Sequence, residues 1–95
     1  MKIIIVDDEK PARDRLNRLI GGLDEYQVVA EASNGSEAVK LTEQFEPDII
    51  LLDIRMPVMD GLEAASHIFK MKHPPAIIFT TAFADHALEA FETHA

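Results

Sequence analysis

The chain has 95 residues and a mass of 10.6 kDa, which suits one compact domain, because a second core would need about fifty further residues. Cysteine is absent, which excludes disulfides, thiolate metal sites and thiol catalysis and agrees with a reducing cytoplasm. Seventeen acidic residues against nine basic ones give a formal charge of -8, the wrong sign for neutralising many phosphates. We therefore expect a single cytoplasmic domain that does not bind nucleic acid directly.

Four short apolar runs, rich in β-branched residues, are typical of strands that are buried on both faces of a sheet. They cover residues 3–6, 28–30, 49–52 and 77–79. The run 3–6, one of the two longest, is followed at once by three acidic residues, so it is neither a signal-peptide core nor a membrane span. We expect no contact with a membrane.

Segments with helical spacing follow each run. The first ends at the glycine pair 21–22, and the second begins near Asn34 and stops at Pro47. The third follows Asp60, and the fourth covers roughly residues 84–92. The side chains expected to face the core share one stripe on each helix: Ala12, Leu16, Leu19 and Ile20; Ala38, Leu41, Thr42 and Phe45; Leu62, Ala65 and Phe69; Ala87, Leu88 and Phe91.

Three arginines of the first helical segment lie off its apolar stripe. They are Arg13, Arg15 and Arg18. We interpret them as solvated charges, with contact to a docking partner as the less favoured interpretation.

The alternation of strand and helix predicts an α/β fold, a doubly wound parallel sheet with right-handed crossovers and helices on both faces. Such sheets bind ligands at the carboxyl ends of their strands, where the winding direction reverses.

The first strand runs into Asp7 and Asp8, the third into Asp53, and the fourth into Thr80 and Thr81. Three carboxylates gathered at this edge would repel one another, and Mg2+ is the cation that such a set of oxygens prefers. An aspartate beside it could act as a nucleophile toward phosphorus.

Four segments together resemble the receiver domain of two-component response regulators. They are Val6-Asp7-Asp8-Glu9, the run 49–57, Met59-Asp60-Gly61 and Thr81-Ala82. The resemblance covers all 95 residues in order and spacing. The segment 80–91 further resembles receivers of the LytR/AlgR type, the group of the alginate regulatory protein. The implied fold is flavodoxin-like (CheY-like), with strand order 2-1-3-4.

The resemblance implies a role for each matching residue. Asp53 is similar to the phosphoacceptor, which takes a phosphoryl group from the phosphohistidine of a sensor histidine kinase. Asp8, Asp53 and the backbone carbonyl of Arg55 would bind Mg2+, and Asp7 would support the ion directly or through water. Thr81 resembles the switch hydroxyl. The module would be a phosphorelay switch and not a turnover enzyme.

Two further residues would shape the loop after the third strand, Pro57 by fixing its backbone and Gly61 by permitting a tight turn. The chain departs from the family at its end, because family receivers continue into a fifth strand and helix. We expect 1–95 to be a C-terminally incomplete receiver domain without an output domain. The family's phosphate-pairing lysine would then be missing, and phosphoryl binding would be weaker by about 1.5 to 3 kcal/mol.

An exposed sheet edge invites pairing with another chain. We therefore expect either a homo-oligomer through the edge left by the fifth strand, or a longer parent protein with a DNA-binding output domain. Two other functions remain open. One is a non-phosphorylated interaction or dimerisation module with a vestigial acidic site. The other is a Mg2+-dependent phosphohydrolase with Asp53 as nucleophile, which is disfavoured because that class places a second acid two residues later, where this chain has Arg55.

Overall fold

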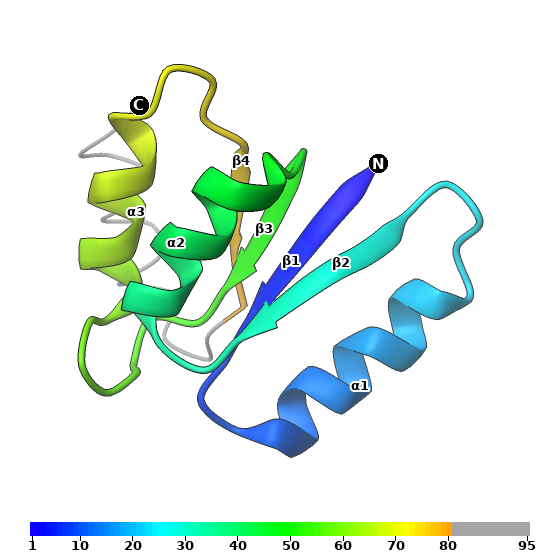
Figure 1. Ribbon diagram of the computed structural model, residues 1–95. Helices are drawn as coiled ribbons and strands as arrows, with labels where there is room; N and C mark the ends of the chain where they lie inside the picture. Colours follow the sequence, from blue (N-terminus) through cyan, green and yellow to red (C-terminus); the bar gives the residue numbers. More distant parts are fainter. Residues whose placement is uncertain (81–95) are drawn as a thin grey trace.

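The computed structural model describes residues 1–80, in which strands and helices alternate (Figure 1). The elements are β1 (Lys2–Val6), α1 (Lys10–Gly21), β2 (Gln27–Ala32), α2 (Gly35–Phe45), β3 (Ile49–Leu52), α3 (Gly61–Phe69) and β4 (Ala76–Phe79). The four predicted strands and the first three predicted helices are confirmed. The helix expected over 84–92 lies outside the described residues.

All four strands are parallel, in the order β2-β1-β3-β4. This confirms the predicted doubly wound sheet. α1 lies on one face, whereas α2 and α3 cover the other (Figure 1). The chain leaves β1 toward β2 on one side and later returns to place β3 on the other side of β1. The winding direction therefore reverses between β1 and β3, which makes their carboxyl ends the expected ligand edge.

The core has one layer on each face of the sheet. On the α2/α3 face, Ile4, Val6, Ile50 and Leu52 pack with Ala65 and other buried residues of these helices. On the α1 face, a smaller cluster is built from Ile3, Ile5 and Ile20, with the ring of Tyr26 packed against it. The residues of β1 alternate between the two layers because successive side chains of a strand point to opposite faces. Each fully buried aliphatic side chain contributes about 1.5 to 3 kcal/mol of burial free energy.

Three residues expected to be buried are exposed, and the sequence prediction was wrong for them. Leu19 is 63% exposed, Ile78 49% and Phe69 38%. Helical spacing identifies the buried side of a helix but not the width of the surface that its neighbours cover. α1 packs on β1 and β2, so Ile78 of β4 lines an apolar groove instead of a closed layer. Ile68, next to Phe69, is the residue that is buried.

Capping side chains fix the starts of α2 and α3. Asn34 accepts a hydrogen bond from the Glu37 N–H at 2.9 Å, and Asp60 accepts one from the Glu63 N–H at 2.9 Å. Glu37 in turn accepts from the N–H of Ser33 at 2.8 Å and from its hydroxyl at 3.0 Å. The backbone N–H of Ser33 is the main cause that lowers the pKa of Glu37. No helix within residues 1–80 has the length and apolar character needed to cross a bilayer.

Candidate functional site

The carboxyl ends of the strands are tied together by backbone hydrogen bonds that continue one residue past each strand. The Asp53 N–H donates to the carbonyl of Val6 at 3.0 Å, and the Thr80 N–H donates to that of Leu52 at 3.0 Å. The loops after β1, β3 and β4 therefore start side by side. This pairing brings Val6 and Asp53, which are 47 positions apart in the sequence (53 − 6), to one edge of the sheet.

Three acids meet at this edge. Asp7, Asp8 and Asp53 each offer a carboxylate oxygen, and these oxygens lie within 4.8 Å of one another. Asp7 and Asp53 are half-buried, and Asp8 is exposed. The structure thus brings together the three carboxylates that the strand ends predicted. All the donor atoms are hard oxygens, which fits Mg2+ and does not fit zinc, since zinc prefers imidazole and thiolate.

The environment of Asp53 disfavours its ionised form. Burial raises the pKa of its carboxyl above the ordinary value, and the carboxylates of Asp7 and Asp8 raise it further. Hydrogen bonds from the backbone N–H groups of Ile54 and Arg55 act in the opposite direction on the same pKa and stabilise the carboxylate. A cation at the cluster would relieve the repulsion between the Asp53 carboxylate and those of Asp7 and Asp8.

The loop between β3 and α3 is fixed by close backbone contacts. The Gly61 N–H donates to the carbonyl of Ile54 at 2.7 Å, and the Gly35 N–H donates to that of Met59 at 2.8 Å. A Cβ atom at either glycine would overlap its neighbour, at Gly61 the backbone of Asp53 and at Gly35 the backbone of Met59. Neither glycine has a positive φ. Gly61 therefore shapes the loop through close backbone approach and not through a left-handed φ.

The tip of this loop carries Pro57 and Val58. Val58 has φ 69°, in the left-handed region that a β-branched residue rarely adopts. Val58 is 84% exposed, so burial offers little to offset the cost of that conformation. Asp60 lies in the same loop, but its carboxylate caps α3, and it is not one of the three clustered acids.

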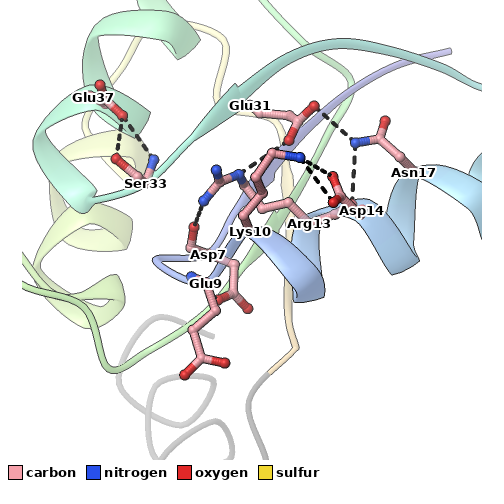
Figure 2. Close-up of polar contacts among 9 residues, drawn as sticks. All are labelled: Asp7, Glu9, Lys10, Arg13, Asp14, Asn17, Glu31, Ser33 and Glu37. Carbon is pink, nitrogen blue, oxygen red and sulfur yellow. Dashed lines mark hydrogen bonds and ion pairs between the residues drawn. The ribbon is translucent and has the colours of Figure 1, made fainter.

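A polar network on α1 reaches the site, and the sequence interpretation missed it (Figure 2). The Arg13 side chain is only 17% exposed. Its Nη1 donates to the carbonyl oxygen of Asp7 at 2.8 Å, and its Nε donates to Glu31 at 3.2 Å. Arg13 is thus not a solvated charge, whereas Arg15 and Arg18 are exposed as expected. Two signals pointed to this network: Asn17 stands one helical turn after Arg13, and Glu31 is the one charged residue of β2.

Two further residues were expected at the site, Arg55 and Thr81, and the structure describes only the first. The structure places Arg55 directly after Asp53, with its N–H bonded to the Asp53 carboxylate. Thr81 lies outside the described residues. Thr80, the last described residue, follows β4 at the same edge of the sheet as Asp53.

The model of the response regulator receiver domain matches residues 3–95. The chain belongs to this family. This confirms the resemblance on which the site residues were assigned.

Known proteins of the family are similar over the whole chain. The positive alginate biosynthesis regulatory protein of Pseudomonas aeruginosa is 53% identical over 96 residues, covering 100% of this chain. The chain spans 39% of the length of that relative. The response regulator domain of Thermotoga maritima CheB is 32% identical, with a TM-score of 0.90, covering 100% of this chain and 73% of that chain. The structure of the CheX-CheY-BeF3-Mg+2 complex from Borrelia burgdorferi is 25% identical, with a TM-score of 0.88, covering 98% of this chain and 71% of that chain.

Proposed function

We propose that residues 1–95 act as a receiver module whose phosphoacceptor is Asp53. The observation that carries this proposal is the cluster of Asp53 with Asp7 and Asp8, whose carboxylate oxygens lie within 4.8 Å of one another. The phosphoryl donor is the phosphohistidine of a sensor histidine kinase in the cytoplasm. A similar solved structure contains CheY with BeF3 and Mg2+, which supports a phosphoryl and magnesium site on this fold.

The transfer is a single substitution at phosphorus. A carboxylate oxygen of Asp53 forms the new O–P bond while the bond between phosphorus and the histidine nitrogen breaks. The released imidazole takes up a proton and leaves as neutral histidine, and Asp53 becomes an acyl phosphate.

Magnesium fits this arrangement. Asp8, Asp53 and the backbone carbonyl of Arg55 would bind the ion, with Asp7 in contact directly or through water. Bound there, the ion supplies positive charge that offsets the repulsion between the acids and the incoming phosphoryl oxygens. The N–H groups of Ile54 and Arg55 hold the Asp53 carboxylate in place.

The response to phosphorylation would pass through Thr81, as the switch hydroxyl that moves toward the phosphoryl group. Relatives of this chain are named as transcriptional regulatory proteins, and the chain spans 39% of their length. We infer that in a longer parent protein the switch would control a DNA-binding output domain. The module itself would act by a shift between two conformations and not by turnover of a substrate.

Intact mass spectrometry after incubation with acetyl phosphate and Mg2+ tests the acceptor. We expect the unsubstituted chain to gain the mass of one phosphoryl group, sensitive to hydroxylamine as an acyl phosphate is, and Asp53→Asn to gain none. Asp24→Asn, the same chemical change at an exposed aspartate, should label normally. No labelling and no phosphate release at any Mg2+ concentration would favour the interaction module, and release of inorganic phosphate over many turnovers without an accumulated phosphorylated chain would favour the phosphohydrolase.

A further inference from the structure

The backbone of Asp7 is held on both sides. Its N–H donates to the carbonyl of Ala32 on β2 at 3.0 Å, and its carbonyl accepts from Nη1 of Arg13 on α1 at 2.8 Å. The first contact continues the sheet, whereas the second depends on one side chain. Asp7 is the first residue after β1, so the Arg13 side chain fixes the peptide group that joins Asp7 to Asp8.

The Arg13 guanidinium is itself fixed by a carboxylate that has two partners. One oxygen of Glu31 accepts from Nε of Arg13 at 3.2 Å, and the other accepts from the side-chain amide of Asn17 at 2.9 Å. The same amide also donates to the backbone carbonyl of Arg13 at 3.2 Å. A planar guanidinium can serve two acceptors at once, which an ammonium group does less well. Figure 2 shows Arg13 between Asp7 and Glu31.

Within residues 1–80, the hydrogen bonds of the loop past Asp7 are local. One oxygen of the Asp7 carboxylate accepts from the Glu9 N–H at 2.9 Å, and Asp8 is exposed. The position of both acids relative to Asp53 therefore depends on how firmly the Asp7 peptide is fixed. Groups that orient metal ligands in this way commonly change metal affinity when they are removed.

We propose that Arg13 is a positioning residue of the site: through the carbonyl oxygen of Asp7 it sets the place of the Asp7 and Asp8 carboxylates relative to Asp53. This inference rests on the proposed function of the site. Arg13 contacts neither a phosphoryl group nor a cation in this role. Glu31 and Asn17 orient Arg13 from β2 and α1.

The charge of Arg13 and its hydrogen bond have opposite effects on a bound cation. The positive charge repels Mg2+ at the neighbouring acids, so its loss alone would tighten binding. The hydrogen bond fixes the ligands, so its loss would weaken binding. The direction in which Mg2+ affinity changes therefore separates a positioning role from that of a nearby charge.

The experiment measures Mg2+ binding to the full chain by calorimetry, at a temperature where thermal melts show each variant folded. For Arg13→Gln we expect a dissociation constant about tenfold higher, at the lower end of what removal of a ligand-orienting partner costs. Arg13→Lys keeps the charge and should still bind Mg2+ more weakly than the unsubstituted chain. Asn17→Ala changes no charge and should weaken binding by about two- to threefold. Arg15→Gln, the same charge change at an exposed position of α1, should not weaken it.

A second measurement needs neither metal nor phosphoryl donor. Amide hydrogen exchange at Asp7 and Glu9 should be about tenfold faster in metal-free Arg13→Gln than in the unsubstituted chain, with exchange in β3 unchanged. Equal or tighter Mg2+ binding by Arg13→Gln, together with unchanged exchange, would overturn the positioning role. If the unsubstituted chain binds no Mg2+, the proposed function fails, and the exchange rates alone then decide whether Arg13 fixes the loop.

Discussion

The loop after β1 and the loop after β3 bring their acids to the same edge of the sheet, but different contacts fix them. Side chains fix the first loop, since Arg13 bonds to the carbonyl of Asp7 and Glu31 orients Arg13. Backbone contacts fix the second, where Gly61 and Gly35 approach too closely for a Cβ atom. Substitution in the second loop should therefore affect folding first, whereas substitution around the first should affect ion binding first.

Gly61→Ala should have the largest effect. The new Cβ would lie 2.8 Å from the Cα of Ile54 and 2.9 Å from the carbonyl carbon of Asp53, backbone atoms that cannot rotate away. We expect a loss of about 3 kcal/mol in the free energy of unfolding, measured by urea denaturation. Gly21→Ala is the matched control, because nothing lies within 4 Å of its Cβ position, and it should be neutral or slightly stabilising. Equal effects of the two substitutions would show that the loop between β3 and α3 relaxes to make room for the added methyl group.

Asp53→Asn should stabilise the metal-free chain at pH 7, because it removes a half-buried charge and its repulsion by Asp7 and Asp8. We expect the free energy of unfolding to rise by about 0.5 to 1 kcal/mol, the scale of interactions between solvent-screened charges. Because the pKa of Asp53 is raised in the folded chain, its contribution to stability is fully present below the unfolded pKa and lost as pH rises through the folded one. The gain should therefore shrink toward pH values of about 4.

Addition of Mg2+ provides a second comparison between the unsubstituted chain and Asp53→Asn. The ion should raise the melting temperature of the unsubstituted chain, because it binds the folded state only, and should leave that of Asp53→Asn nearly unchanged. Thermal melts with and without Mg2+ across pH check both statements. A stability gain that is independent of pH, or an equal response of both chains to Mg2+, would contradict the electrostatic account of the cluster.

Val58→Gly should have the smallest effect. The left-handed φ of 69° costs a residue with a Cβ atom about 1 to 2 kcal/mol, and glycine loses about 0.5 to 1 kcal/mol through its freer unfolded chain. We expect a net gain of about 0.5 kcal/mol. Val58→Ala retains the Cβ atom and should gain less. Thermal denaturation of both variants decides whether the tip of the second loop is strained.

The sequence was sufficient to predict the elements and the gathering of the acids. Prolines, glycines and capping residues mark the ends of the helices, and the strand 49–52 was predicted with its observed bounds. Asp7 and Asp53 could be placed together because parallel strands end at one edge, so the topology alone decides their proximity. These predictions depend on local signals and on the order of the elements.

The parts that failed depend on contacts between distant segments. Leu19 and Phe69 have the spacing of core residues, but which part of a helix is covered depends on its neighbours. Arg13 was not recognised as partly buried because its partner Glu31 lies 18 residues away, and the two meet only where α1 packs on β2. The reason for glycine at position 61 is likewise tertiary, since it is the backbone of Asp53 that leaves no room for a side chain.

The place of Tyr26 decides what intrinsic fluorescence can report. It is the only tyrosine of the chain, which has no tryptophan, and it packs in the layer beneath α1. Its emission will follow the folding of that layer. Ion binding at the acids should be nearly silent to this fluorophore, so that optical titrations need an aromatic probe introduced beside Asp53.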